Sequence, residues 1–258
     1  MGRALRRSWG ETTTTLLTII ALSGCVTIGQ QSGPLPNVGS IHTGALRIGY
    51  QGMQIPLPEG EWVLVGLREY SINGPFASGV LARFDGDTVF QLTSFDVPLS
   101  WGPGYVASKL CERDDVHFTK RKANQAGGNQ DCWIVNHWRM TGGGQRLPLQ
   151  WDQALEYAVE NGISVPINMM TVEYRRATSH RMMNVNYFFN PEAEGFPPPK
   201  YADWSTSDWH RDRARLDPKR AAYIETIKAW GEAWKVQVDA GFDGKLPTSP
   251  QVETKPAY

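Results

Sequence analysis

The densest cluster of side chains capable of acid–base or metal chemistry lies between residues 203 and 213, in the run DWSTSDWHRDR. Carboxylates and an imidazole can exchange protons with a substrate, and both can bind divalent metal ions. One interpretation is a site that gathers several of these side chains: Asp203, Asp208, His210, Asp212 and, from further upstream, Glu173. The other is a loop leading into the last helix, with its charges facing water, and we favour this second interpretation.

Familiar catalytic motifs are missing from the sequence. It contains no Gly-x-Ser-x-Gly, Ser-x-x-Lys or His-Glu-x-x-His motif, and no glycine-rich loop that ends in Lys-Ser or Lys-Thr. Asp114 and Asp115 are adjacent, so in a strand they would point to opposite faces and could not act as a pair. His137, between aromatic residues, is expected to be a packed side chain. We therefore predict no catalytic, cofactor-binding or metal-binding residue, and we expect a binding protein rather than an enzyme.

Two cysteines, Cys111 and Cys132, follow an N-terminal segment with the layout of an export signal. Such pairs usually form disulfides. Zinc sites normally bring paired ligands two to four residues apart, whereas the nearest companion of Cys132 is His137. We predict a Cys111–Cys132 disulfide, with two reduced thiols as the alternative.

Tryptophan is the one residue type in clear excess, with ten copies in the chain. Four of them are expected in loops or at the ends of elements: Trp101, Trp151, Trp204 and Trp209. Exposed indoles there could stack on a sugar or grip a partner. The alternative, which we favour, is that the loops fold back and bury them.

Alternating apolar and polar residues predict a series of strands that could position these side chains. The expected strands cover residues 61–70, 77–84, 88–97, 116–122, 132–140, 167–177 and 181–190. Asp85, Gly86 and Asp87 predict a tight turn, and a second hairpin joins 167–177 to 181–190.

Three helices are expected between and after these strands. A short helix covers about 105–112, and a second runs from its cap at Asp152 to Gly162. The last begins at Asp217 and Pro218 and stops at Gly241. Its apolar stripe consists of Tyr223, Ile227, Trp230, Trp234 and Val238. The sequence therefore predicts an α+β fold, an antiparallel sheet built of hairpins with about three helices packed on it.

The opening of the domain carries Leu57, Pro58, Gly60 and Trp62 in the pattern Leu-Pro-x-Gly-x-Trp. With the amphipathic helix that closes the chain, this opening resembles the Mog1 and PsbP superfamily of small α+β domains. The resemblance implies the same class of fold, and no binding residue is carried across from it.

The N-terminus places Arg3, Arg6 and Arg7 ahead of a short apolar run, which is the layout of a secretory signal. The run is too short and too rich in threonine to span a bilayer. It ends in Leu22, Ser23, Gly24 and Cys25, which resembles the lipobox of bacterial lipoproteins. An ordinary secretory signal with a chance cysteine is the alternative.

The lipoprotein resemblance implies that residues 1–24 are a signal peptide and that Cys25 becomes the acylated first residue of the mature chain. Several acyl chains, such as palmitate, on one residue make a durable membrane anchor. Val26 stands where inner-membrane retention usually needs Asp, so we expect the periplasmic face of the outer membrane. Residues 25–45 are rich in Gly, Ser, Pro and Gln and are expected to be a flexible tether.

Residues 46–258 are expected to form a single globular domain. Without the signal peptide the chain has 23 basic and 25 acidic residues, a net charge of −2 that does not attract nucleic acid. The hypothesis that we favour is a noncatalytic envelope lipoprotein, anchored in the bilayer through Cys25, that binds an envelope protein or glycan. An envelope hydrolase with an unrecognised site and a glycan-binding module that uses loop tryptophans are the alternatives.

Overall fold

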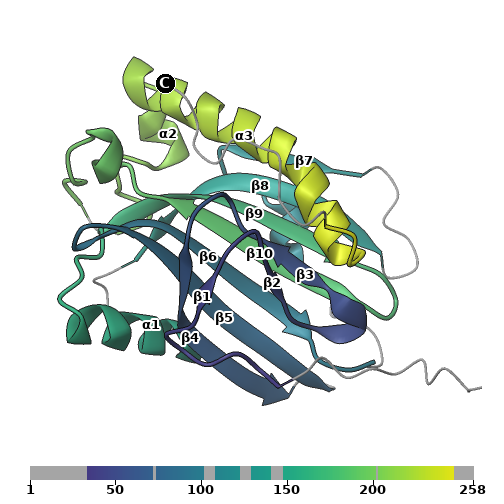
Figure 1. Cartoon of the computed structure of the whole chain (residues 1–258). Coiled ribbons are helices and arrows are strands. Elements are labelled where there is room, and N and C mark those ends of the chain that lie inside the picture. Colours follow the sequence, from purple (N-terminus) through teal and green to yellow (C-terminus); the bar gives the residue numbers. More distant parts are fainter. Residues whose placement is uncertain are drawn as a thin grey trace, which may run out of the picture.

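An eight-stranded antiparallel sheet forms the centre of the protein, with the strand order β1-β4-β5-β6-β10-β9-β8-β7 (Figure 1). The computed structural model describes residues 34–71, 74–101, 108–122, 129–140, 148–201 and 203–246. The strands of the sheet are β1 (Ile41–His42), β4 (Trp62–Ser71), β5 (Pro75–Asp85), β6 (Thr88–Pro98), β7 (Phe118–Arg121), β8 (Gln130–Arg139), β9 (Asn168–Ala177) and β10 (Met182–Phe189). The predicted α+β class and antiparallel sheet are confirmed.

Helices lie on both faces of this sheet. The long helix α3 (Pro218–Phe242) crosses one face over β8 and β9, and α1 (Leu149–Glu160) packs on the other face at one end, against β4 and β5 (Figure 1). The remaining elements are the short helix α2 (Arg211–Ala214), the 3₁₀ helices η1 (Tyr50–Gly52), η2 (Lys109–Glu112) and η4 (Glu192–Glu194), and a small sheet of β2 (Ala45–Arg47) and β3 (Gln54–Pro56). We call the two sides of the large sheet the α3 face and the α1 face.

Both predicted hairpins are present. Asp85 pairs with Thr88 across a two-residue turn, and Gly86 in that turn has φ 59°, a value that glycine adopts without strain. The strands β9 and β10 pair along their whole length. Because side chains alternate between faces, Val172 and Tyr174 turn toward α3 and Glu173 turns to the α1 face.

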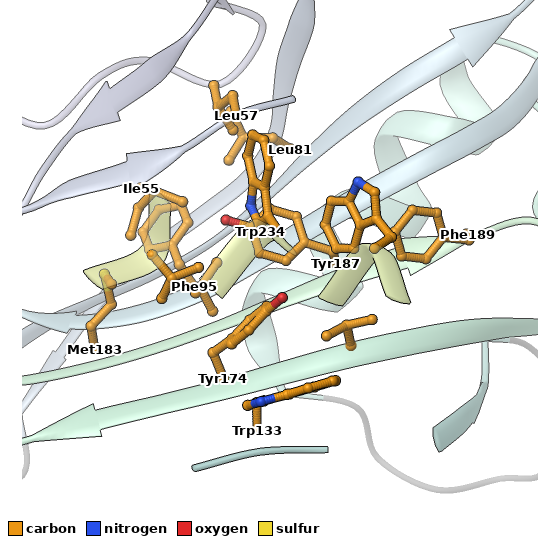
Figure 2. Packing of buried hydrophobic residues seen from close by; sticks show 14 of the residues in the cluster. Ile55, Leu57, Leu81, Phe95, Trp133, Tyr174, Met183, Tyr187, Phe189 and Trp234 are labelled. Carbon is orange, nitrogen blue, oxygen red and sulfur yellow. The ribbon is translucent and has the colours of Figure 1, made fainter. Parts of the chain in front are cut away.

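The main core lies between the α3 face and α3, and it is rich in aromatic rings (Figure 2). The predicted apolar stripe of the last helix is buried here: Tyr223, Ile227, Trp230, Trp234 and Val238. Two tyrosine hydroxyls satisfy backbone carbonyls at this interface. Tyr174 donates to Gly231 O at 2.7 Å, and Tyr187 donates to Pro56 O at 2.8 Å.

The start of α3 is as predicted, but its predicted end is wrong. Asp217 caps the helix by accepting hydrogen bonds from the backbone N–H groups of Lys219 and Arg220. Gly241 lies inside the helix, which continues to Phe242. A Cβ at Gly241 would lie 2.2 Å from Gln54 O, so this glycine permits close contact between α3 and β3 rather than ending the helix.

Two other helix boundaries also differ from the prediction. The helix α1 begins at Leu149, after Pro148, so Asp152 is a first-turn residue that favours the helix dipole and is not the cap. Trp151 therefore lies in the first turn of α1, at the end of an element as expected. Residues 109–112 of the expected short helix form η2, while residues 105–107 lie outside the described residues.

The described chain begins inside the predicted tether. Ile41 and His42 form β1 and pair with Val63 and Trp62 of β4. Residues 25–33 of the tether and the whole signal segment, including Cys25, lie outside the described residues.

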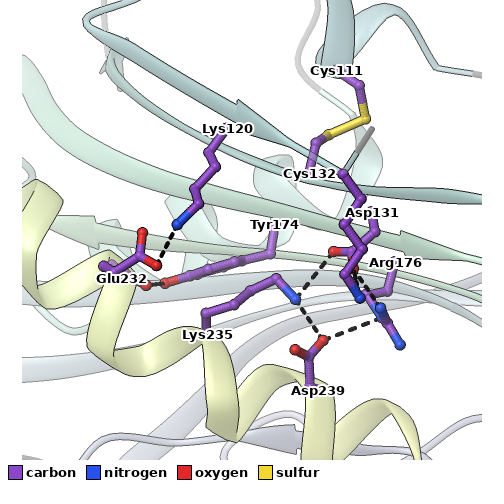
Figure 3. A network of polar contacts seen from close by, with 11 residues as sticks. Cys111, Lys120, Asp131, Cys132, Tyr174, Arg176, Glu232, Lys235 and Asp239 are labelled. Atoms are coloured by element: carbon purple, nitrogen blue, oxygen red, sulfur yellow. Dashed lines mark hydrogen bonds and ion pairs between the residues drawn. A yellow bond between two sulfur atoms is a disulfide. The ribbon is translucent and has the colours of Figure 1, made fainter. Parts of the chain in front are cut away.

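The predicted disulfide between Cys111 and Cys132 is present, and it joins η2 to β8. Close to it, an ion network links the sheet to α3 (Figure 3). Asp131 on β8 lies 3.1 Å from Lys235 Nζ on α3 and 2.6 Å from Arg176 Nη1 on β9. The same Lys235 is 2.5 Å from Asp239, one turn further along α3.

Removal of the disulfide should lower the stability of the domain. The bridge joins residues 21 apart in sequence, and a loop of this size is worth roughly 3 kcal/mol of unfolding free energy in the chain-entropy model. We expect reductant to lower the melting temperature of the purified full chain, followed by circular dichroism. A Cys111→Ser/Cys132→Ser variant should melt at the lower temperature with or without reductant. Equal melting of the oxidised and reduced wild-type protein would contradict this.

Candidate functional site

The structure does not bring the five predicted acid–base candidates together. Glu173 lies on the α1 face of β9, whereas the segment 203–210 packs near His137 on the α3 face. Each of the other three acids has a basic partner of its own. The nitrogen–oxygen distances are 3.0 Å for Asp203–Arg139, 3.7 Å for Asp208–Arg220 and 3.4 Å for Asp212–Arg215. Among the described residues, no group of three or more His, Cys, Asp or Glu side chains could hold a metal ion.

Two histidines, the buried His137 and the partly buried His117, hold the segment 203–210 against the sheet. His117 Nε2 donates to Trp209 O, and His137 Nε2 donates to Trp204 O, both at 2.9 Å. Burial lowers the pKa of His117 to about 4 and that of His137 to about 3, so both rings are neutral at neutral pH. His137 is thus a packed side chain, as predicted, and it stacks on the Trp204 ring at 5.1 Å between centroids.

The four tryptophans proposed for sugar stacking do not form a row of exposed indoles. Trp151 and Trp209 are buried, and Trp204 is half-buried against His137. Trp101 is 60 % exposed and lies beside His180. The structure therefore gives no support to a binding surface made of these four side chains.

The strongest candidate site is a set of polar side chains on the α1 face, in the middle of the sheet. Glu173 and Thr171 of β9 are neighbours on this face, and their register partners include Asn136 of β8 and Asn186 of β10. Asn186 in turn donates to Ser94 Oγ of β6 at 3.2 Å. We call these five residues, Asn136, Thr171, Glu173, Asn186 and Ser94, the polar patch.

Two atoms of the polar patch are buried without a hydrogen-bond partner, Glu173 Oε1 and Thr171 Oγ1. Glu173 is only 7 % exposed and Thr171 is fully buried. A buried polar atom left unpaired costs about 1–3 kcal/mol, so the fold tolerates an unfavourable arrangement here. Burial raises the pKa of Glu173 to about 7, although the positive charge of Arg113 acts in the opposite direction.

The segment 108–111 lies beside the polar patch, and the disulfide holds it in place. Cys132, a register partner of Arg175 on β9, carries the bridge to η2. Gln130 adds two hydrogen bonds with the backbone of Ser108, one accepted from its N–H at 3.2 Å and one donated to its carbonyl at 3.0 Å. Arg175 donates to Gln130 Oε1 at 2.5 Å. The disulfide and Gln130 therefore anchor both ends of the segment 108–111 next to the patch.

On the other side, the polar patch continues into a carboxylate on β6. Asp96 accepts hydrogen bonds from Ser78 Oγ and, at 3.3 Å, from Tyr70 OH, and burial raises its pKa. Its register partner Asn184 accepts from Arg175 Nη1 at 2.7 Å. Asp96, Asn184 and Asn186 are half-buried, so solvent reaches this side of the patch.

An apolar cavity adjoins the polar patch under α1. Its lining includes Val65, Leu92, Trp151 and Tyr157, and it exposes almost no polar atoms. Leu92 pairs in register with Phe188, which in turn pairs with Thr171. The α1 face thus changes from apolar under the helix to polar in the middle of the sheet.

Sequence reasoning named Glu173 but grouped it with the wrong residues, and it missed the rest of the polar patch. The available signal was the alternation within two central strands. Thr171, Glu173 and Arg175 on β9 share one face, as do Asn184 and Asn186 on β10. Polar residues on one face of an interior strand indicate a face that an apolar helix does not cover.

Comparisons with family models, with curated proteins and with solved structures found no match to this chain. In the part of the chain that the structure describes, none of the helices has the length and apolar character needed to cross a membrane. The polar patch is accordingly interpreted from its own chemistry.

The substitution Glu173→Gln should make the protein less sensitive to alkaline pH. Because the pKa of Glu173 is raised from 4.5 to about 7, its stabilising contribution is complete below pH 4.5 and is lost as pH rises through 7. The free energy of unfolding of the variant, relative to wild type, should therefore increase by about 2 kcal/mol between pH 5 and pH 8.

Urea unfolding at the two pH values measures this difference. His117 and His137 contribute equally to both proteins and cancel in the comparison. Glu69→Gln, at an exposed position on β4, is the matched control and should show no such increase. A difference between Glu173→Gln and wild type that is independent of pH would contradict the assignment.

Proposed function

We propose that this chain is a lipid-anchored protein of the bacterial cell envelope whose globular domain acts by binding a ligand. The observation that supports binding is the polar patch, where Glu173 Oε1 and Thr171 Oγ1 are buried without partners. Unpaired buried groups on a rigid sheet are more costly to the free protein than to a complex in which a ligand satisfies them.

The anchor is inferred from the N-terminal sequence. Leu22, Ser23, Gly24 and Cys25 match the lipobox pattern behind a basic and then apolar segment. An acylated Cys25, followed by the short Gly- and Ser-rich segment, would hold the domain close to the periplasmic face of the outer membrane. The domain would meet its ligand at the envelope, and the ligand would be an envelope protein or glycan.

Substitution of Cys25 should abolish membrane attachment. A Cys25→Ala chain should not incorporate radioactive palmitate, and it should leave the membrane fraction, because the acyl chains supply the anchoring energy. The matched control is Ser23→Ala, which keeps the cysteine and a small residue before it. Equal palmitate labelling of Cys25→Ala and wild type would refute the lipoprotein proposal.

The ionic segment 203–212 has structural roles that do not require catalysis. Asp208 accepts a hydrogen bond from the backbone N–H of Lys200 and pairs with Arg220, while His210 caps α2 by accepting from the backbone N–H of Asp212. Both contacts position loops rather than reacting groups.

We expect an Asp208→Ala/His210→Ala chain to be less stable than wild type by about 1 kcal/mol and yet to function. The measurement is whether the variant gene restores the wild-type phenotype of a deletion strain, with Cys25→Ala as the variant expected to fail. If the double variant folds and reaches the membrane but does not restore that phenotype, the segment 203–212 is part of the working site.

An envelope hydrolase is the second candidate, and one observation favours it. The raised pKa of Glu173, about 7, is the value that a general acid needs at neutral pH. The deciding experiment incubates the purified chain with isolated cell wall. Release of soluble fragments that is absent with Glu173→Gln would establish hydrolysis in place of binding alone.

A further inference from the structure

We propose that the polar patch is the ligand site of this domain and that its ligand is an uncharged sugar. The proposal rests on the binding function proposed above and names the chemistry of the ligand. Three features of the described residues lead to it: the unpaired hydrogen-bonding atoms, the paired arginines beside them, and the aromatic side chains at the border of the patch.

The two unpaired atoms belong to side chains on the same face of one strand. Glu173 and Thr171 are two residues apart on β9, so their side chains leave the same face of the strand roughly 6.6 Å apart. Asn136 and Asn186 lie across from them on the neighbouring strands. Carboxyl, hydroxyl and amide groups each donate or accept hydrogen bonds, which suits the dual character of a sugar hydroxyl.

Both arginines beside the patch are already paired, and this favours an uncharged ligand. Arg113 is paired with Asp115 through two contacts of 2.7 and 2.8 Å, and Arg175 is held by Gln130 and Asn184. Asp96, whose pKa is raised by burial, lies on β6 across β10 from Arg175. An anion would find both arginines beside the patch already paired, and a cation would find the carboxyl of Glu173 only partly ionised at neutral pH. An uncharged polar ligand avoids the cost of losing the hydration of a charge.

Aromatic side chains lie directly beside the polar groups. Phe188 pairs in register with Thr171, and Trp138 lies two residues from Asn136 on the same face of β8. The rings of Trp138 and Phe188 meet edge to face at 6.4 Å between centroids, and Trp138 is 36 % exposed. An indole ring next to convergent polar groups can pack its face on the C–H groups of a sugar while the patch binds the hydroxyls.

The most exposed part of the patch lies on β10. Asn184 and Asn186 are half-buried, unlike Thr171 and Glu173, so a ligand entering there would reach the buried carboxyl last. The segment 108–111, held by the disulfide and by Gln130, limits the site on the other side. Its position would set how long an oligosaccharide the site accepts.

Isothermal titration calorimetry on the purified lipidated full chain in detergent tests the proposal. The probes are maltotriose and triacetylchitotriose, with spermidine and inorganic phosphate as charged comparisons. We expect saturable binding of at least one sugar with a dissociation constant on the order of 0.1–1 mM, and no binding of spermidine or phosphate. No heat with either sugar at about 10 mM, or binding of a charged probe instead, would overturn the proposal.

Substitutions locate the site. Thr171→Val and Glu173→Leu should each weaken sugar binding by about tenfold or more, while Glu173→Gln, which keeps two hydrogen-bonding groups, should weaken it less. The exposed Glu69→Gln is the control and should bind as wild type. Should Glu173→Leu fail to fold, the near-isosteric Thr171→Val still decides, and unchanged binding by that variant would overturn the assignment. Palmitate labelling is independent of these titrations, so a failure here leaves the anchor proposal intact.

Discussion

The packing of α3 along one face of the sheet is the contact on which the rest of the structure depends. This helix buries its whole apolar stripe against β8, β9 and β10, and each large side chain fully buried there contributes about 1.5–3 kcal/mol. The approach is close because Gly231 and Gly241 lack side chains where a Cβ would collide with Trp133 and with Gln54 O. Strand alternation then assigns every second residue of the central strands to this interface.

The same alternation places the other half of the strand residues on the α1 face, which α3 does not cover. The helix α1 is only 12 residues long and packs on β4 and β5, over a second apolar cluster that includes Leu92 and Phe188. Beyond this cluster, the α1 face of β6, β10 and β9 carries polar side chains. Most of these groups bond one another, as Asn186 does with Ser94 and Arg175 with Gln130. Glu173 and Thr171 do not, which is why function is assigned to them rather than to their satisfied neighbours.

Features encoded by neighbouring residues were predictable from the sequence. The β5–β6 turn, the β9–β10 hairpin and the stripe and cap of α3 all follow from patterns within about 25 residues, and the disulfide follows from cysteine parity. Gly241 was misassigned because a glycine that ends a helix and one that lets a strand approach look alike in sequence. The close contact of Gly241 is with the backbone oxygen of Gln54, which lies far away along the chain, so the residues around Gly241 do not reveal it.

The polar patch could not be predicted for the same reason, because it depends on strand order. The sheet places β9 between β8 and β10, and β10 beside β6, so that Asn136, Glu173, Asn186 and Ser94 become neighbours although they come from four separate segments. Each of these residues taken alone is an ordinary polar residue of a strand. The sequence indicates Glu173 only as a carboxylate that could join the cluster at 203–212. The sheet lies between Glu173 and that cluster.

The two faces of the sheet also place titratable groups with opposite effects on stability. On the α3 face, burial lowers the pKa of His117 and His137 to about 4 and 3, so their contribution is present above pH 6.5 and is lost as pH falls toward those values. On the α1 face, the raised pKa of Glu173 means that its contribution is lost as pH rises from 4.5 through 7. Two groups act in one direction and one in the other, so their sum increases with pH up to about 6.5 and then declines slightly. At neutral pH the carboxyl of Glu173 is thus close to its pKa, whereas both histidines are already neutral. A ligand that binds its protonated form through a hydrogen bond would shift that balance without disturbing the α3 face.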